Sequence, residues 1–204
     1  MNSAADIKQA FQRVYDENRW SIGSGPGSSP RNTVEYRAFL ERFIENNNVK
    51  TIVDLGCGDW QFSPLIDWSE REYKGYDVVP GIVEANRAEF QSKNVKFEVF
   101  RDINELPSSD LCIAKEVFQH LPNDVISSYI NVIRQKFRFA LITNNIEPHA
   151  HCNIDTPAGG CRPVRLDESP FLTLGATVFS YYTFANGTYW KNGVFLVVGN
   201  SNRD

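Results

Sequence analysis

The sequence predicts an α/β fold in which helices cover both faces of a mostly parallel sheet. From Lys50 onward, short segments with strand composition alternate with segments of helical periodicity, an order typical of βαβ units. The strand segments are apolar and β-branched, which is typical of strands that are buried on both faces. With 204 residues, of which 42% are hydrophobic and 23% are charged, the chain is expected to form one domain.

Two helices are predicted before the first strand. In residues 4–18, apolar side chains such as Ile7, Phe11 and Val14 recur at helical spacing. Residues 21–30 contain three glycines, two prolines and four serines, and this composition predicts a loop. A second helix is expected after the loop, with Asn32 as its N-cap and Glu35 three residues later.

Five strands and two helices are predicted to follow. The expected strands span residues 51–55, 72–77, 95–100, 111–114 and 139–143. A helix is expected over 79–91, where Pro80 suits the first turn, and another after Asn123, its expected N-cap. These segments supply the alternation on which the predicted fold class rests.

The C-terminal part predicts an antiparallel pair of strands at one end of the sheet. After an irregular stretch, 144–170, the runs 176–184 and 193–199 are rich in aromatic and β-branched residues, with turn signals at Asn186-Gly187 and Asn192-Gly193. No repeat and no second domain are evident. We therefore expect one domain over 1–204, in which 1–49 form a helical cover and 50–204 form the core, with 144–170 as an insertion.

Composition excludes several classes of protein. No apolar run approaches the roughly 18 residues that a membrane helix needs, and the first 19 residues lack the apolar segment of a signal peptide, so a cytoplasmic protein is expected. The formal net charge of −4 predicts no broad basic surface for a long nucleic acid. A loose cluster of histidines and cysteines matches no familiar ligand spacing, so no metal site is expected: His149, His151, Cys152 and Cys161.

The most informative segment is the first expected strand and the turn after it, Asp54-Leu55-Gly56-Cys57-Gly58. Two glycines let the backbone turn tightly and approach a ligand, and ligands of open parallel sheets bind beyond the carboxyl ends of the strands. A pyrophosphate-binding fingerprint would have a third glycine where Gln61 stands. The carboxylate of Asp54 would repel phosphate and attract an ammonium or sulfonium group. A helix is expected to follow the turn.

This segment resembles motif I of the class I S-adenosylmethionine-dependent methyltransferases, which carry [DE]-x-G-x-G near the first strand. Three further segments agree in order and position: Gly75-Tyr76-Asp77, Asp102-Ile103, and 113–122 after the fourth strand. The resemblance covers about residues 50–143. It implies a Rossmann-like three-layer sandwich whose seven-stranded sheet has the order 3-2-1-4-5-7-6, with the last strand antiparallel.

The resemblance also implies S-adenosylmethionine as the cofactor. It places the acid of the second strand at the ribose hydroxyls, the acid after the third strand at the adenine amine, and the segment after the fourth strand under the methionine moiety. Trp60 stands where a third glycine is common and could cover the methionine part or line the acceptor pocket. The implied cofactor-binding residues are Asp54, Gly56, Gly58, Trp60, Asp77, Val78, Asp102, Ile103 and Glu116.

Each of the charged residues and the tryptophan also has a purely structural interpretation. Asp54 could be a turn residue, Asp77 a solvated strand end, and Asp102 the cap of the next turn. Glu116 could be a solvated helix start, and Trp60 could pack in the core.

His120 is the leading candidate for a catalytic residue. A sulfonium methyl group is already electrophilic, so the protein mainly has to align a nucleophile with it, and a base helps when the acceptor is a hydroxyl or a protonated amine. His120 follows the fourth strand near the expected methyl position; its alternative is a structural role beside Pro122. His149, His151, Arg162 and Arg165 are weaker candidates for acceptor contacts, with a plain loop as the alternative.

Two N-terminal features leave alternatives open. The 21–30 loop could close over the cofactor as a lid, or it could be a flexible joint between two helices. Arg37 could meet the cofactor carboxylate or be an exposed helix residue.

The function predicted is transfer of a methyl group from S-adenosylmethionine to a small molecule. Enzymes that methylate exocyclic base amines carry [DNS]-P-P-[YFW] after the fourth strand, where this chain reads Ala114-Lys115-Glu116-Val117. The alternatives are a protein side chain as acceptor, and a non-catalytic scaffold that binds the cofactor. A nucleotide-dependent oxidoreductase is disfavoured by Asp54 and by the missing third glycine. The sequence does not predict the oligomeric state.

Overall fold

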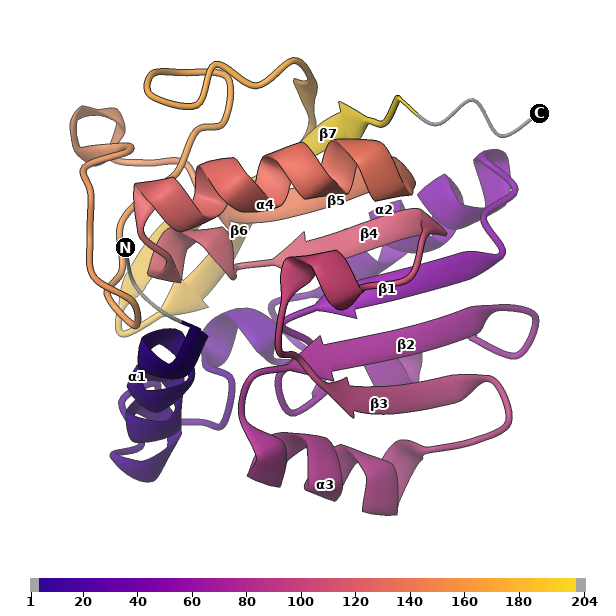
Figure 1. The fold of residues 1–204 in the computed structure, drawn as a ribbon. Helices are drawn as coiled ribbons and strands as arrows, with labels where there is room; N and C mark the ends of the chain where they lie inside the picture. The colour runs from indigo at the N-terminus through magenta and orange to yellow at the C-terminus, as the bar shows by residue number, and fades with distance from the viewer. Residues whose placement is uncertain (1–3, 201–204) are drawn as a thin grey trace.

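A seven-stranded sheet forms the centre of the computed structural model, which describes residues 4–200 (Figure 1). The first three and last four residues of the predicted 1–204 domain lie outside the described residues. The strands are β1 (Thr51–Leu55), β2 (Glu72–Asp77), β3 (Val95–Val99), β4 (Ser109–Lys115), β5 (Phe137–Asn145), β6 (Ala176–Ala185) and β7 (Thr188–Val198). Their order is β3-β2-β1-β4-β5-β7-β6, and β7 runs antiparallel to both of its neighbours. The predicted order and directions are confirmed.

Parallel pairing brings the carboxyl ends of the central strands to one edge of the sheet. Asp54 of β1 lies opposite Gly75 of β2 on one side and Ile113 of β4 on the other. Two residues further along β2 and β4 stand Asp77 and Lys115, the last residues of those strands. The register therefore gathers charged residues from three strands at this edge.

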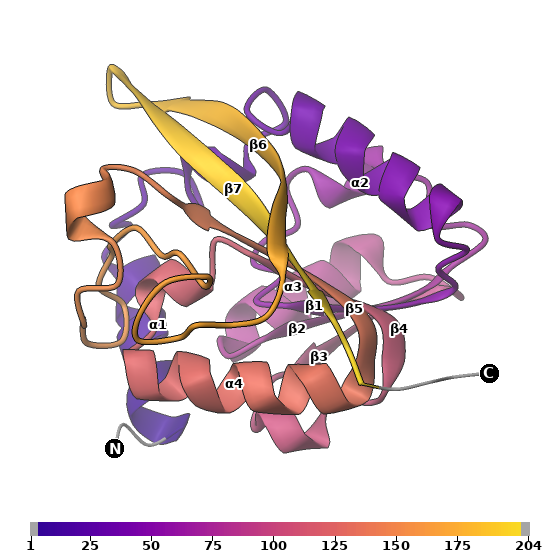
Figure 2. The ribbon, with the colours of Figure 1, turned by 90° about the horizontal axis from the view of Figure 1, so that it is seen from above.

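Helices cover both faces of the sheet, as predicted. Figure 2 shows α2 (Val34–Asn46) and α4 (Asn123–Lys136) on opposite faces, and α3 (Pro80–Phe90) packs its buried Val83 in the same apolar layer as α2. The fourth helix, α1 (Ala4–Asp16), lies beyond the carboxyl ends of β1 to β3 (Figure 1) and adds Ile7 and Phe11 to the apolar layer of α4. Among the helices described, none is long and apolar enough to cross a membrane.

The helix expected after the glycine turn does not form. Between β1 and β2 the described chain has only a 3-10 turn, Ser63–Leu65. Trp60 has a φ of 58°, outside the helical region, and Pro64 has no backbone N–H to donate. Apolar residues of this segment are buried against the sheet on the α2 face: Trp60, Phe62, Ile66 and Trp68.

Both predicted N-caps are wrong, because tertiary contacts occupy the two asparagine side chains. Helix α2 begins after Thr33, and the Asn32 amide instead pairs with the backbone of Phe184 on the edge strand β6, donating to its carbonyl at 3.0 Å and accepting from its N–H at 3.3 Å. Helix α4 begins at Asn123 itself, with Pro122 as the N-cap. The Asn123 side chain donates to the Asn153 carbonyl at 2.9 Å.

The C-terminal hairpin is confirmed, with one correction. Its turn is at Asn186-Gly187, as predicted, between β6 and β7. The second predicted turn, Asn192-Gly193, lies inside β7, where both residues pair with β5 and with β6. The fully buried Asn192 donates through its amide to the Thr183 hydroxyl at 3.2 Å, which satisfies a polar side chain that usually marks a turn.

Candidate functional site

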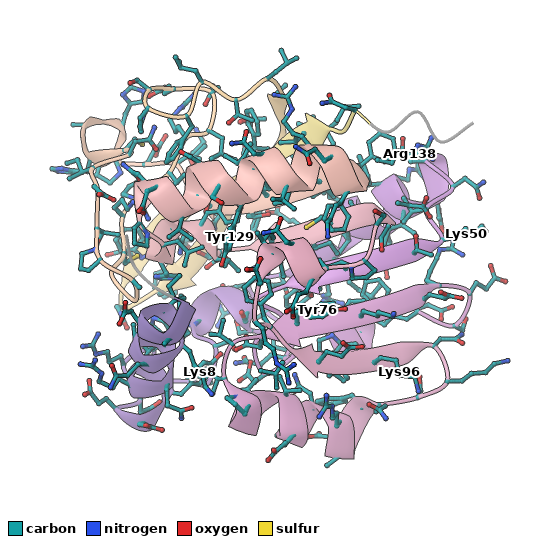
Figure 3. The ribbon with its side chains drawn as sticks, in the orientation of Figure 1. Lys8, Lys50, Tyr76, Lys96, Tyr129 and Arg138 are labelled. Carbon is teal, nitrogen blue, oxygen red and sulfur yellow. The ribbon has the colours of Figure 1, made fainter. Side chains whose placement is uncertain are left out.

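A cavity of about 330 Å³ opens at the carboxyl ends of the central strands. Its floor comes from the ends of β1, β2 and β4, and α1 and the 21–28 segment form another wall. Tyr129 of α4, labelled in Figure 3, lines it from the α4 face. Seven of the predicted site residues line this cavity: Asp54, Gly56, Gly58, Asp77, Val78, Glu116 and His120.

Asp54 is a buried carboxyl group held by one strong hydrogen bond. The Tyr73 hydroxyl donates to its Oδ2 atom at 2.5 Å, and the Trp60 indole N–H donates to the same hydroxyl at 2.8 Å. Burial raises the pKa of Asp54 to about 6, while the Tyr73 hydrogen bond and the charge of Lys115 lower it. A positively charged ligand would stabilise the ionised form of this carboxyl group.

Asp77 connects the glycine turn to the end of β2. Its Oδ2 atom accepts the Gly58 N–H and its Oδ1 atom accepts the Val79 N–H, each at 3.0 Å. Burial raises its pKa to about 6, against the lowering effect of these two N–H groups. Because each carboxylate oxygen has a further lone pair, the group can still accept hydrogen bonds from two ligand hydroxyls.

The two glycines are required by backbone conformation and by close approach. Gly56 has a φ of 74° and Gly58 a φ of 57°, in the left-handed region where a side chain is strained. A Cβ at Gly58 would lie 2.1 Å from the Ser24 hydroxyl oxygen, and one at Gly56 would lie 2.5 Å from a methyl group of Val117. Only glycine lets these neighbours approach the turn.

The 21–28 segment is bound to the rest of the site at two places. At the first, the Ser24 hydroxyl accepts the Asp59 N–H at 2.8 Å and lies 2.8 Å from the Tyr15 hydroxyl of α1, while the Ser24 N–H donates to Asp59 at 3.1 Å. At the second, the Lys115 ammonium donates to the Gly27 carbonyl at 2.9 Å. The segment thus forms a wall of the cavity.

Lys115 and Glu116 form a partly buried ion pair at the end of β4. The ammonium lies 2.6 Å from Oε1 of Glu116 and 5.6 and 5.5 Å from the ring centroids of Tyr36 and Phe62. Glu116 has a φ of 57°, a strained conformation for a residue with a side chain. No role for Lys115 was predicted from the sequence. Its position directly after the apolar run Leu111–Ala114 could have indicated a charged residue at the end of the strand.

His120 lies in the 3-10 turn Phe118–His120, and both of its ring nitrogens have a polar neighbour within hydrogen-bond distance. Its Nδ1 atom lies 2.6 Å from the Gly160 carbonyl oxygen, which can only accept, so Nδ1 carries the hydrogen of the neutral ring. Nε2 is then the acceptor nitrogen, and the side-chain nitrogen of Gln119, which can donate to it, lies 3.4 Å away. Burial lowers the pKa of His120. The site therefore holds a neutral imidazole that could take up a proton at Nε2.

Three predicted cofactor residues do not line the cavity. Trp60 is 5% exposed and packs its ring against Tyr73, Phe90 and Phe97. Asp102 accepts the Asn104 N–H at 2.7 Å and so caps the 3-10 turn Ile103–Glu105, and Ile103 is buried in the α4-side layer. The contacts of Trp60 and Asp102 are those of their structural alternatives, and the predicted cofactor contacts of all three residues stay predictions.

The three arginines that were candidates for ligand contacts bind other residues of the protein instead. Arg165 pairs with Asp167 at 3.2 Å and with Glu168 at 2.7 Å, and His149 also lies 2.9 Å from Glu168. Arg37 lies 3.4 Å from the Pro30 carbonyl, and Arg162 binds the segment beside His120, as described below. Within residues 4–200, no three His, Cys, Asp or Glu side chains come together as a metal-binding group.

Three aromatic residues that line the cavity were not assigned to it from the sequence. They come from α1 and the loop after it, far along the chain from the strand ends, so no local pattern places them at the site. The residues are Phe11, Tyr15 and Trp20. Trp190 of β7 also lines the cavity; the late aromatic residues, Trp190 among them, could be expected from the sequence either to form an acceptor pocket or to pack the sheet edge. The Trp20 ring lies 5.1 Å from the His120 ring, next to the candidate base.

Comparison with known proteins gives a likeness of structure. No family model and no curated protein sequence matches the chain. Among solved structures it is similar to the N-methyltransferase NodS from Bradyrhizobium japonicum WM9 in complex with S-adenosyl-L-homocysteine, with a TM-score of 0.63 and 12% identity, covering 94% of this chain and 98% of NodS. It is also similar to magnesium protoporphyrin IX methyltransferase (ChlM) from Synechocystis PCC 6803 with S-adenosylhomocysteine bound, with a TM-score of 0.57 and 13% identity, covering 81% and 83% of the two chains.

Proposed function

We propose that this chain, whose fold is that of the class I S-adenosylmethionine-dependent methyltransferases, transfers a methyl group from S-adenosylmethionine to a small molecule. The observation that carries the proposal is the pair of buried carboxyl groups, Asp54 and Asp77, on either side of the Gly56–Gly58 turn in one cavity. Fold alone would not support an activity, because one fold serves many functions.

The polar groups that line the cavity fit S-adenosylmethionine better than they fit a dinucleotide. The free lone pairs of Asp77 suit the two ribose hydroxyls, and the negative charge of Asp54 favours the cationic amino acid end of the ligand. A pyrophosphate in the same place would be repelled by both carboxylates. Glu116 and residues of the 21–28 segment complete the lining of the same cavity.

The chemistry of transfer needs little from the protein beyond position and a base. When bound, S-adenosylmethionine supplies an electrophilic methyl group whose bond to sulfur breaks as the acceptor attacks, with the electron pair returning to sulfur. His120 would accept the acceptor's proton at Nε2, which carries no hydrogen because Nδ1 donates to Gly160, and the long 3.4 Å contact of Nε2 with the Gln119 side chain would give way to the acceptor. Aromatic walls at Trp20 and Trp190 would orient the acceptor and exclude water.

A small molecule is the proposed acceptor because the cavity that contains His120 has both aromatic and polar walls. Trp20, Gln119, Cys161 and Trp190 all line this cavity. A mixed aromatic and polar cavity of this size is typical of small-molecule sites. ChlM, a structural neighbour, is a magnesium protoporphyrin IX methyltransferase, and the small-molecule substrate in that name supports the same class of acceptor here.

Isothermal titration with S-adenosylmethionine and S-adenosylhomocysteine tests the cofactor. We expect dissociation constants in the micromolar range, and an Asp77→Ala variant that binds at least about tenfold more weakly, a loss of about 1.4 kcal/mol or more. Asp124→Asn, an exposed aspartate on α4 outside the cavity lining, is the control and should bind like the original chain. Folded protein that binds neither ligand would overturn the proposal.

Methyl transfer is then tested with labelled S-adenosylmethionine and a panel of amines, phenols, carboxylic acids and proteins. Labelling of a small molecule that falls by about a hundredfold in His120→Gln supports the proposed reaction. Labelling of proteins alone would favour a protein side chain as acceptor. Tight cofactor binding with no transfer to any acceptor would favour a non-catalytic cofactor-binding scaffold.

A further inference from the structure

The short segment 159–162 of the insertion is bound along the 3-10 turn that carries His120. The Gly159 N–H donates to the His120 carbonyl at 2.9 Å, and the Arg162 N–H donates to the Gln119 carbonyl at 3.2 Å. Between these two bonds, the Gly160 carbonyl accepts the hydrogen of His120 Nδ1 at 2.6 Å. The orientation of the imidazole is therefore set by a segment 40 residues away in the chain.

Arg162 holds this segment in place from both ends of the turn. Its side chain is buried, at 6% exposure, and its guanidinium donates to the Phe118 carbonyl at 2.8 Å and to the Asn123 side-chain oxygen at 2.7 Å. Phe118 begins the 3-10 turn and Asn123 begins α4, so the guanidinium bridges the two ends of 118–123, with His120 between them. A planar fork with fixed donors suits two acceptors in this arrangement.

We propose that Arg162 is a positioning residue for His120, which keeps the Gly160 carbonyl against Nδ1 so that the unprotonated Nε2 is the nitrogen available in the cavity. The proposal rests on the proposed function, because it assigns a purpose to the base. Arg162 acts through Gly160 and is not itself among the residues that line the cavity. This positioning role would explain why an arginine is buried beside a histidine that must stay neutral.

The groups around His120 act on its pKa in opposite directions. Burial and the positive charge of Arg162 lower the pKa of His120, whereas the Gly160 carbonyl and Glu116 raise it. From α1 and the loop after it, the ring faces the uncharged side chains of Phe11 and Trp20. Removing the guanidinium would take away a positive charge and would also loosen the Gly160 carbonyl, and these two changes have opposite effects on the pKa. The tautomer of the ring is therefore the direct measure of the role of Arg162.

The decisive measurement is the tautomer of His120 by ¹⁵N NMR of the histidine rings, which is tractable because the chain has three histidines. In the original chain we expect a hydrogen on Nδ1 and an acceptor at Nε2. In Arg162→Met we expect a mixture of tautomers, because the Gly160 carbonyl is no longer held against Nδ1. Arg165→Met, which removes a guanidinium paired with Asp167 and Glu168, is the matched control and should leave the tautomer unchanged.

Arg162→Lys provides a second variant if Arg162→Met does not fold. A lysine keeps the charge but cannot hold both acceptors as a fork, so an intermediate loss of the Nδ1 tautomer is expected. Binding of S-adenosylhomocysteine should be unchanged in all three variants, and the rate of methyl transfer should fall by about tenfold or more in the Arg162 variants with KM little changed. An unchanged His120 tautomer in a folded Arg162 variant would overturn the proposal. Failure of the original chain to bind the cofactor would instead overturn the proposed function and leave the NMR result standing.

Discussion

The Tyr73 hydroxyl donates a 2.5 Å hydrogen bond to the carboxyl group of Asp54, and both side chains are buried. The same hydroxyl accepts the indole hydrogen of Trp60. Two consecutive hydrogen bonds therefore connect Trp60, just after the glycine turn, to Asp54 in β1, just before it. Trp60 is thereby connected to the candidate site through Tyr73, although its own ring lies in the core.

Tyr73→Phe is expected to destabilise the protein by about 2–4 kcal/mol. The substitution leaves two buried polar groups, the Asp54 carboxyl and the Trp60 N–H, without the partner they have now, and each such loss costs about 1–3 kcal/mol. It should also raise the pKa of Asp54 further, because the lost hydrogen bond lowers it. Urea unfolding measures the effect. Tyr76→Phe on the same strand should cost less than about 1 kcal/mol, and equal costs for the two variants would contradict the assigned bonds.

The sheet could be predicted from the sequence because its signals are local. Each parallel strand is a short apolar run, and the acids at its carboxyl end, Asp54 and Asp77, meet at one edge whatever the details of the loops. Gly56 and Gly58 were also visible as residues whose backbone conformation excludes other side chains. The candidate cofactor end of the site was therefore open to prediction.

The rest of the site depends on contacts between distant segments. Asn32 and Asn123 were predicted as caps from neighbouring residues, but partners on β6 and in the insertion compete for their amides. The ion pair that Lys115 makes is local, yet its bond to the Gly27 carbonyl joins residues 88 positions apart. Trp60 was predicted as a site residue because it stands where the resembling family often has a third glycine. Its large apolar ring is instead buried by contacts with distant parts of the chain.

Gly58→Ala is expected to weaken cofactor binding by at least about tenfold and to lower stability by about 2 kcal/mol. The new methyl group would stand 2.1 Å from the Ser24 hydroxyl oxygen, and the left-handed conformation costs about 1 kcal/mol or more for alanine. Displacing Ser24 would also break its bonds to Tyr15 and Asp59. Calorimetric titration with S-adenosylhomocysteine and urea unfolding measure the two effects.

The control for this prediction is Gly81→Ala, in the first turn of α3. A Cβ there would meet no described atom within 4 Å, so alanine should be neutral or stabilise the helix by up to about 1 kcal/mol. A Gly58→Ala variant that behaves like Gly81→Ala would show that the turn and the 21–28 segment are not in contact as described.

Lys115→Met is expected to destabilise the protein by about 3 kcal/mol, because it leaves the Glu116 carboxylate without its cation in a largely buried position. The double variant Lys115→Met, Glu116→Gln should recover a large part of this loss, since the uncompensated charge is gone. A double-mutant cycle in urea gives the coupling energy between the two residues. Additive effects of the two substitutions would contradict an interacting pair. The Gly27 carbonyl loses the Lys115 ammonium as its donor in both the single variant and the double variant. The loss of stability that these two variants share therefore includes that contact.

The pH dependence of stability and that of cofactor binding should have opposite signs at Asp77. Burial raises the pKa of this carboxyl group from 3.8 to about 6 in the free protein. Between about pH 6 and pH 4 the folded state therefore binds a proton that the unfolded chain does not, and the contribution of Asp77 to the free energy of unfolding increases as the pH falls through this range. Asp54, whose pKa is also raised to about 6, contributes in the same direction, whereas His120, whose pKa is lowered, contributes in the opposite direction below pH 6.5.

Cofactor binding needs the ionised form of Asp77, because only a carboxylate can accept hydrogen bonds from both the backbone N–H groups and the ribose hydroxyls. The affinity for S-adenosylhomocysteine should thus be constant above about pH 7 and fall as the pH drops below about 6, while the free protein gains stability from the same protonation. Asp77→Asn isolates the effect from Asp54 and His120: the difference in unfolding free energy between the two proteins should change with pH between 4.5 and 7, and the variant should lose the part of the binding slope due to this residue. A pH-independent difference between the two proteins would mean that Asp77 titrates at its ordinary value and is exposed to water in the free protein.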